Sequence, residues 1–582
     1  MAVRRGVWLV IILIVVAVFV SAVGMLLLAT TVAREPTVAA NSTLILRVGG
    51  NLYETEPGGV FGPFMETAPT VRSVVDALRK AKSDSRISSV ILRPTGAAAL
   101  WGKVQEVRDA ITDFRRSGKP IIAYLEYGGE QEFYLATACD KVFLMPTASL
   151  DLTGMASYEL FLRGTLDKIG AYPDALHIGE YKTASNTFTE HTYTPAHREM
   201  AESLNNDMFD QLVRGIAAGR RKSEAEVKAL IDHGPFLPED ALRAGLIDDL
   251  AYEDELDDKV KLAPGKVRFI ETNEYRQVSA SGLGLNRGSK IAVIYAAGVI
   301  ASGKSSDGPG SAVVGSDTII EYLRKARADA AIKAIVLRVD SPGGSAIASD
   351  IIWREVVLTK NQKPVIASMS DVAASGGYYI AMPAHAIVAE PSTLTGSIGV
   401  VLTKFVIDGT LKKLGMNMEG VSQGKFAGMY APTRPFTAEE RQRMTENMQA
   451  TYDTFVEKAA QGRNTTPEKI DAIGQGRVWT GRQAKEIGLV DELGGLDRAV
   501  ALAKQRAKIA QDTEVELVIY PPRKSFYEVL SDPFGNSSSS ASTTLAQLLG
   551  FSNPKALQAL AAPLQVFRRG EPLALMPNVF VR

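Results

Sequence analysis

The sequence contains very little cysteine and histidine, with one Cys and five His among 582 residues. A single thiol cannot form an intramolecular disulfide, and no Cys/His spacing of the zinc-binding kind is present. The thiol, Cys139, lies in the apolar run ATACDKVFL, so we expect it to be buried and inert. Net charge is absent as well, because 65 basic residues balance 65 acidic ones. This balance, without a long run of one sign, leaves no electrostatic case for nucleic-acid binding.

One long hydrophobic run is present near the N-terminus. Arg4 and Arg5 precede an uncharged run at residues 6–33. As a helix rising about 1.5 Å per residue, this run exceeds the roughly 30 Å hydrocarbon core of a bilayer. It is also longer than the about 7–15 apolar residues of a cleaved signal, although the small residues of ATTVA fit a cleavage site. We therefore expect a retained transmembrane anchor, with residues 1–5 in the cytoplasm and the main body on the opposite side.

The rest of the chain is internally duplicated. Three stretches of the first half have counterparts about 245 residues later in the chain. The first-half stretches are RISSVILRPTG, GKPIIAYLE and DKVFLMPTASLDLTG, and their counterparts are AIKAIVLRVDSPGG, KPVIASMSD and HAIVAEPSTLTG. A period this long indicates a duplicated domain, because solenoid repeats have periods of only about 20–50 residues.

Each half alternates short apolar, β-branched runs with amphipathic stretches. VILR, PIIAYLE and AIVLRVD are typical of strands, whereas VRSVVDALRKA and TIIEYLRKARADA have the three- and four-residue apolar spacing of helices. Such alternation predicts an α/β fold with mostly parallel strands. We expect domains at residues 44–277 and 289–520 with a Gly/Ser-rich linker between them, and a linker with a C-terminal tail at residues 531–582.

Two small-residue stretches of the second half are candidates for chemistry. DSPGGS at residues 340–345 and DVAASGGYYIA at residues 371–381 each follow a predicted strand and precede a helical stretch. Free N–H groups at such a junction can bind a developing oxyanion. The same residues also fit a plain strand-to-helix turn and an N-cap serine at Ser375. The matching first-half stretch, EYGGEQEFYLA, has no serine, which favours a working Ser375.

A nucleophilic serine needs a proton acceptor. None of the five histidines has a recognisable catalytic setting, whereas a lysine serves if burial lowers its pKa from about 10.4. Two lysines at corresponding places in the two halves are candidates, Lys182 in HIGEYKTASNTF and Lys425 in VSQGKFAGMYAP. Because most lysines are solvated surface charges, the residues alone leave both candidates open.

Together, DSPGGS, DVAASGGYYIA, STLTGSIGV and EYKTAS resemble the signal peptide peptidase A (protease IV) family in its long, duplicated bacterial form. The resemblance covers roughly residues 44–510 and the anchor. It implies tandem Clp/crotonase-like α/β domains preceded by one transmembrane helix. It also implies a Ser/Lys serine peptidase that needs neither a metal nor an organic cofactor. An extended substrate would pair with a strand edge near the glycine turn.

The resemblance also implies the site residues. The nucleophile falls on Ser375 and the general base on Lys182. Lys425 lies where the short, unduplicated form carries its base, and is therefore the alternative base. The oxyanion donors fall on the N–H of Gly376 and on that of Gly344 or its neighbour Gly343.

Partners and location follow from the same resemblance. The substrates would be cleaved signal peptides and other hydrophobic peptides, and the enzyme would be a single-pass protein of the bacterial inner membrane with its body in the periplasm. Family members form bowl-shaped assemblies, so we expect a homo-oligomer, a tetramer. Two other interpretations remain. One is a non-catalytic membrane scaffold or peptide-binding protein, and the other is a crotonase-like acyl-CoA enzyme, which the anchor and the lack of an obvious adenine-nucleotide site disfavour.

Overall fold

The computed structural model describes Val16 and residues 35–55, 69–260, 268–308, 311–522, 571–577 and 580–581. The predicted cytoplasmic residues 1–5 lie outside this set, and so does the predicted anchor at residues 6–33 apart from Val16. Within the described ranges, no helix is long and apolar enough to cross a membrane. The predicted linker and tail at residues 531–582 are described only for residues 571–577 and 580–581.

The first half of the chain forms a parallel six-stranded sheet in the order β7-β4-β3-β2-β1-β8. Its strands are β1 (Ser42–Asn51), β2 (Ile87–Ala98), β3 (Ile121–Leu125), β4 (Lys141–Leu144), β7 (Asp249–Leu250) and β8 (Arg268–Glu271). The central strand β3, with the sequence IIAYL, is buried along its whole length. A run of apolar residues without alternation is what a parallel strand covered on both faces requires.

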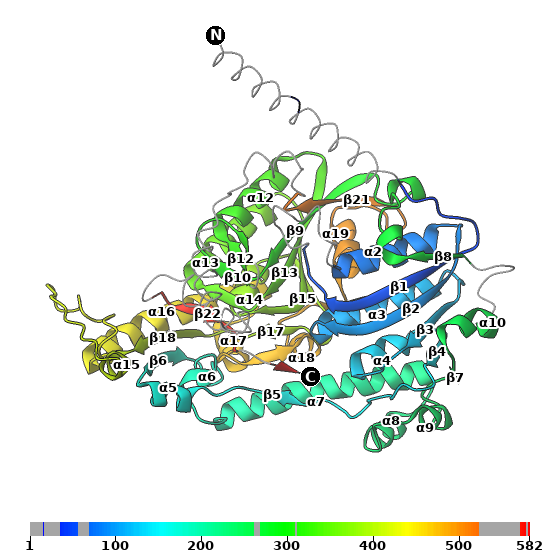
Figure 1. Cartoon of the computed structure of the whole chain (residues 1–582). Coiled ribbons are helices and arrows are strands. Elements are labelled where there is room, and N and C mark those ends of the chain that lie inside the picture. Colours follow the sequence, from blue (N-terminus) through cyan, green and yellow to red (C-terminus); the bar gives the residue numbers. More distant parts are fainter. Residues whose placement is uncertain are drawn as a thin grey trace, which may run out of the picture.

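The second half repeats this arrangement. Its sheet has the order β19-β17-β15-β13-β9-β21, and β16 and β20 extend it beside β15. The strands are β9 (Ser289–Ala297), β13 (Ile332–Ser341), β15 (Val365–Ala374), β16 (Ala386–Ala389), β17 (Leu394–Gly396), β19 (Val478–Thr480), β20 (Glu492–Leu493) and β21 (Val515–Tyr520). Neighbouring strands β9, β13 and β15 correspond to β1, β2 and β3 of the first sheet, and Figure 1 shows the two sets in green and blue.

The helices confirm the duplication by their lengths. Helices α2 (Val71–Ser83) and α12 (Ser316–Ala328) have 13 residues each, and α3 (Trp101–Arg115) and α13 (Ala346–Lys360) have 15 each. Helices α7 (Pro195–Arg220) and α16 (Ala438–Arg463) both have 26. The shorter helices are α4 (Glu130–Ala136), α5 (Arg163–Ile169), α6 (Asn186–Thr189), α8 (Glu224–Ile231), α9 (Pro238–Arg243), α10 (Leu256–Val260), α11 (Thr272–Tyr275), α14 (Gly376–Ala381), α15 (Asp408–Lys413), α17 (Pro467–Ile473), α18 (Gly481–Glu486) and α19 (Leu496–Arg506).

A third sheet joins the two halves. Its order is β11-β12-β10-β14-β22-β18-β6, and it combines one strand of the first half, several of the second and one from the tail. The strands are β6 (Tyr172–Ile178), β10 (Val299–Ala301), β11 (Ser306–Gly308), β12 (Ser311–Gly315), β14 (Gly343–Ser345), β18 (Val400–Val406) and β22 (Leu573–Leu575). A short ribbon also pairs β5 (Ser157–Tyr158) with β23 (Phe580–Val581). The prediction of tandem α/β domains is therefore correct, and their interface is built from backbone pairing as well as side chains.

The hydrophobic core also runs across the junction between the halves. The core of the first half includes Ala374 and Leu394 from the strands β15 and β17 of the second half. Strand β15 ends directly before Ser375, and β17 ends at Gly396, whose carbonyl accepts a hydrogen bond from the Ser375 N–H. Cys139, the only thiol, lies buried in the same core, and burial raises its pKa well above the ordinary value, as an inert thiol requires.

Candidate active site

Ser375 lies at the junction between the carboxyl end of β15 and the start of α14. Its backbone has φ 55° and ψ −113°, which is rare for a residue with a side chain. Two hydrogen bonds hold this conformation: the Ser375 N–H donates to the carbonyl of Gly396 at 2.8 Å, and Tyr379 N–H donates to the carbonyl of Ser375 at 2.8 Å. The side chain is fully buried. This strained backbone conformation, fixed by two hydrogen bonds, therefore fixes the position from which the Ser375 side chain extends.

Lys182 reaches this place because β6 pairs with β18. The antiparallel register sets Ile178 opposite Val400, so the chain that continues from β6 arrives beside the turn that precedes β18. Two glycines make room for the lysine. A methyl group on Gly476 would lie 2.5 Å from the Lys182 backbone nitrogen, and one on Gly399 would lie 3.0 Å from its Cδ.

The side chains of Lys182 and Ser375 meet, with 2.8 Å between Nζ and Oγ. Nζ also lies 2.9 Å from the carbonyl oxygen of Ser397 and 3.0 Å from its Oγ. Lys182 is only 1% exposed, and this burial lowers its pKa well below the ordinary lysine value. A lysine that loses its charge easily can accept a proton from a serine hydroxyl.

Ser397 also lies at this site, although the sequence alone did not indicate a role for it. It lies within the stretch STLTGSIGV, which contributes to the family resemblance. Like Ser375 it has a positive φ, 52°, and its N–H donates to the carbonyl of Arg477 at 2.7 Å. Its two oxygens orient the amine of Lys182, because an amine with two fixed partners keeps its third direction for Ser375.

The alternative base, Lys425, lies elsewhere. Its side chain is 66% exposed and its Nζ forms an ion pair with Glu439. None of the five histidines, all of them in the described part of the chain, forms a recorded hydrogen bond with Ser375. The structure thus brings Lys182 to the hydroxyl and leaves Lys425 at the surface.

The predicted oxyanion glycines also lie together. A methyl group on Gly343 would lie 2.6 Å from the backbone nitrogen of Gly376. Gly343 and Gly344 have φ of 98° and 152°, so this close approach needs glycine. The Gly343 N–H already donates to Ser341 Oγ at 3.1 Å, so Gly344, which lies opposite Ala574 of β22, carries the remaining candidate N–H of this turn.

Buried charges fix β15, the strand that ends directly before Ser375, to the first half. The carboxylate of Asp371, four residues before Ser375, accepts from the backbone N–H groups of Leu100 at 3.0 Å and Lys103 at 2.7 Å. Lys103 Nζ in turn lies 2.7 Å from Asp340 and 3.4 Å from Asp371. Burial raises the pKa of Asp371 to about 6, against the opposing charge of Lys103.

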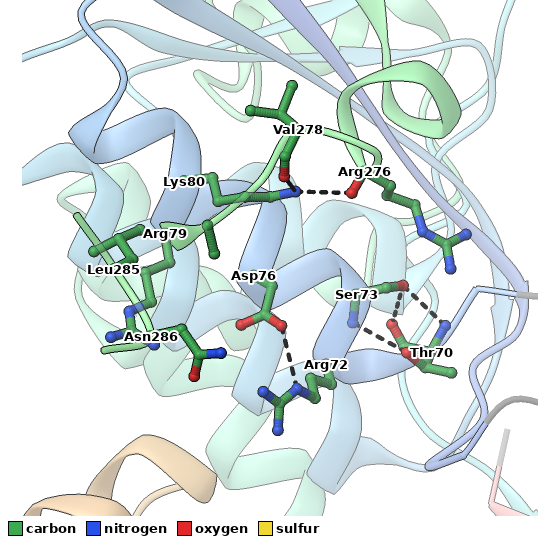
Figure 2. Close-up of a pocket in the computed structure, with 11 residues that line it drawn as sticks. Thr70, Arg72, Ser73, Asp76, Arg79, Lys80, Arg276, Val278, Leu285 and Asn286 are labelled. Carbon is green, nitrogen blue, oxygen red and sulfur yellow. Dashed lines mark hydrogen bonds and ion pairs between the residues drawn. The ribbon is translucent and has the colours of Figure 1, made fainter. Parts of the chain in front are cut away.

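A second candidate site is a polar pocket of ≈ 250 Å³ beside α2, shown in Figure 2. Arg72 and Lys80 line it, but both already have protein partners. Arg72 Nε lies 3.2 Å from Asp76, and Lys80 Nζ donates to the carbonyls of Arg276 and Val278 at 3.0 and 2.9 Å. We therefore assign no ligand to this pocket. Within the described residues, no cluster of His, Cys, Asp and Glu is arranged to hold a metal ion.

Comparison with known proteins agrees with the duplication of the chain. The model of "Peptidase family S49" matches residues 113–265 and 358–510, one match in each half. The chloroplastic serine protease SPPA of Arabidopsis thaliana is 40% identical over 479 residues, covering 81% of this chain and 70% of that protein. Protease 4 of Salmonella typhi is 36% identical over 453 residues, covering 75% and 72%. Protease 4 of Haemophilus influenzae is 33% identical over 462 residues, covering 76% and 74%.

Proposed function

The chain belongs to peptidase family S49 and is a serine peptidase, and from this premise we propose that Ser375 is its nucleophile and Lys182 its general base. The observation that carries the proposal is the 2.8 Å contact between Lys182 Nζ and Ser375 Oγ inside a buried site. A non-catalytic scaffold would not need a lysine with a lowered pKa at that position.

The reaction begins with neutral Lys182, which takes the proton of the Ser375 hydroxyl as Oγ attacks a peptide carbonyl carbon. The N–H groups of Gly376 and Gly344 stabilise the oxyanion of the tetrahedral intermediate. Lys182 then gives its proton to the leaving amine, and an acyl-enzyme ester remains on Ser375. Water, deprotonated by Lys182, hydrolyses that ester and restores the hydroxyl.

We propose cleaved signal peptides and other hydrophobic peptides as substrates. The support is the resemblance of the combined motifs to the signal peptide peptidase A family, together with the apolar run at residues 6–33. An enzyme held by that run in the bacterial inner membrane, with its body in the periplasm, would meet such peptides as they leave the bilayer. A homo-oligomer, a tetramer by the same resemblance, belongs to this proposal, and sedimentation of the detergent-solubilised protein would measure its mass.

The catalytic assignment is tested with the purified full chain. A fluorophosphonate probe should label the wild-type enzyme, and a fluorogenic hydrophobic peptide should be cleaved. Ser375→Ala should abolish both signals, and Lys182→Met should lower cleavage by at least about 10³-fold, the usual cost of losing a general base together with activation of the nucleophile.

Lys425→Met is the matched control, because it removes the same charge from an exposed position. It should leave cleavage within about twofold of wild type. If Lys425→Met inactivates the enzyme and Lys182→Met does not, the assignment of the base is wrong.

A further inference from the structure

One short stretch, QGRVW, which starts at Gln475, joins the two segments that meet at the amine of Lys182. The N–H of Tyr181 donates to the Gln475 carbonyl at 2.7 Å, and the N–H of Ser397 donates to the Arg477 carbonyl at 2.7 Å. Tyr181 directly precedes Lys182 in the chain. The backbone of this stretch therefore holds the proposed base and the serine that orients it against one another.

The side chain of Arg477 lies between two aromatic rings. Its Cζ is 4.7 Å from the ring centre of Tyr181 and 4.5 Å from that of Trp479. A flat guanidinium is attracted to the faces of aromatic rings and fits closely against them. The indole N–H of Trp479 donates to the carbonyl of Ile473 at 3.0 Å, which fixes that ring in place. We call Tyr181, Arg477 and Trp479 the arginine–aromatic cluster.

One carboxylate of the first half contacts two members of the arginine–aromatic cluster. Arg477 Nη1 lies 2.6 Å from Glu199 Oε1, and the Tyr181 hydroxyl donates to Glu199 Oε2 at 3.0 Å. Glu199 belongs to the long helix α7, and its side chain is 57% exposed. An ion pair so open to solvent contributes little stability, so its main effect is on the geometry of Arg477 and Tyr181.

The duplicated half provides an internal comparison. Helices α9 and α18 have six residues each and are followed, one residue later, by GLIDDL and GLVDEL. The five residues directly before these helices are HGPFL in the first half and GRVWT in the second, so only the second has an arginine. A role in packing this helix alone would apply to both halves. The difference therefore favours a role at the site of Ser375 and Lys182.

We propose that Arg477 is a positioning residue for the base: its side chain holds Tyr181, and with it the turn that places Lys182 against Ser375. The inference rests on the proposed function. Without this side chain the turn has more freedom, and a shift of about 1 Å in a catalytic group costs up to about 10²-fold in rate. A less confined amine also meets more water, which favours its charged form.

The experiment is steady-state kinetics of the full-length Arg477→Met variant with the hydrophobic peptide, measured across pH. The value of kcat should fall by about tenfold or more, and KM should stay within about twofold, because the side chain positions the base and does not bind the peptide. The pH midpoint, at which kcat/KM reaches half of its plateau, should rise. A variant with wild-type kcat and an unchanged midpoint overturns the inference.

Arg163→Met is the matched control. Arg163 lies 5.0 Å from the ring centre of Tyr172 and 2.6 Å from Asp167, and its side chain is 18% exposed, against 17% for Arg477. It therefore has the same kinds of contact without the link to Lys182. The control should keep kcat, KM and the pH midpoint of wild type, and equal losses in the two variants would show a general effect on folding.

Glu199→Gln separates position from charge, and its exposed site keeps the test available if Arg477→Met does not fold. Loss of the Arg477 charge by itself would raise the pH midpoint, as loss of position does. Loss of the Glu199 charge by itself would lower it, because a nearby carboxylate favours the charged lysine. A midpoint that rises in Glu199→Gln supports positioning. A midpoint that falls shows that charge acts through space and overturns the inference.

Lys182→Met is measured in the same assay. If it inactivates the enzyme while Arg477→Met behaves like the control, the inference is wrong and the proposed function stands. If Lys182→Met keeps its activity, the base is a different residue, and the proposed function fails together with the inference.

Discussion

At the scale of the residue, the proposed site depends on one lysine, Lys182, that is buried away from water. Lys182 has hydrogen-bond partners in Ser375 and Ser397, and burial is the cause of its lowered pKa. Within the described residues, its amine forms no ion pair with a carboxylate that would stabilise the charged form. The fold therefore holds a costly buried amine at the place where the proposed mechanism needs a proton acceptor for the serine.

The pH dependence of activity should follow this lysine. Only the neutral amine accepts the serine proton, so kcat/KM should rise with pH through the lowered pKa of Lys182 and reach a plateau before pH 10.5. A pH–rate profile with the hydrophobic peptide measures the rise. A profile that climbs only around the ordinary lysine value would show that the catalytic amine is exposed.

The same lysine should make the free energy of unfolding depend on pH. Between its lowered folded pKa and 10.5, the unfolded chain binds a proton at Lys182 and the folded chain does not, so the free energy of unfolding should rise with pH in that window. The slope contributed is at most about 1.4 kcal/mol per pH unit. Lys182→Met should lose this slope and be more stable at the low end of the window. Denaturant titrations at several pH values compare the two proteins, and parallel curves would contradict the burial of a neutral amine.

Gly343 should be intolerant of any side chain. A methyl group there would lie 2.0 Å from the Ala574 oxygen and 2.6 Å from the nitrogen of Gly376, a donor that we assign to the oxyanion. Gly343→Ala should therefore displace the Gly376 N–H and lower kcat/KM for the peptide by about 10²-fold or more.

Gly303→Ala is the matched control for Gly343→Ala. Gly303 has a similar φ, 96°, but no atom lies within 4 Å of an added methyl group. It should lose about 1 kcal/mol of stability from backbone strain and keep its activity. Equal activity of the two variants would show that the close contact at Gly343 is unimportant.

At the scale of the element, helix α3 is capped from the other half of the chain. Its own N-cap residue, Leu100, provides no side-chain hydrogen bond, and its first turn has no acidic residue. Asp371, which belongs to the strand β15 of the second half, accepts from Leu100 N–H and Lys103 N–H instead. A capping carboxylate contributes to a helix by satisfying its free N–H groups, and here it also positions the strand that ends at Ser375.

Asp371→Ala should lower the free energy of unfolding by about 2 kcal/mol, because two buried N–H groups lose their acceptor and Lys103 loses one of its two charge partners. The measurement is the denaturation midpoint. Asp113→Ala removes a carboxylate from the same helix where it pairs with Lys82 at the surface, and should cost less than about 1 kcal/mol. Equal losses in the two variants would mean that the cap across the halves is weak.

At the scale of the whole molecule, one buried arginine links the two halves. Arg338 of β13 lies 2.9 Å from Glu54 and 2.6 Å from Glu106, both of the first half, and donates to Ser368 and Ser370 of its own half. Burial alone would raise the pKa of Glu54, but the charge of Arg338 holds it at about 2. The halves therefore share an ionic network as well as a hydrophobic core.

Arg338→Met should destabilise the folded chain by about 3–5 kcal/mol, because it leaves two carboxylates buried without their cation. Arg498→Met is the control, since its ion pair with Glu492 is exposed and should contribute less than about 1 kcal/mol. Thermal or denaturant unfolding of both variants measures the difference. A loss in Arg338→Met as small as that of the control would show that the network does not hold the halves together.

The sequence was enough to predict the duplication and the fold class. In both halves, apolar runs of four to ten residues alternate with stretches that have helical spacing. The apolar runs form strands in the structure, because a parallel strand that is buried on both faces requires apolar residues along its length. The same sequence pattern could not predict the third sheet. Strands β6 and β18 pair across more than 200 residues, and neither sequence indicates its partner. The predicted domain limits and the anchor at residues 6–33 stay predictions.

By itself, the sequence determined the chemistry available to this protein: a serine between small residues, two glycine turns, two candidate lysines and no histidine in a catalytic setting. Only the tertiary structure decided which lysine meets Ser375. The stretches EYKTAS and GKFAGM each place a lysine next to small residues, and the two lysines differ in where the folded chain positions them. The pairing of β6 with β18 buries Lys182 against the hydroxyl, while Lys425 lies in solvent beside Glu439. Long-range strand pairing determines which lysine contacts Ser375, and the local sequence around each lysine does not indicate that pairing.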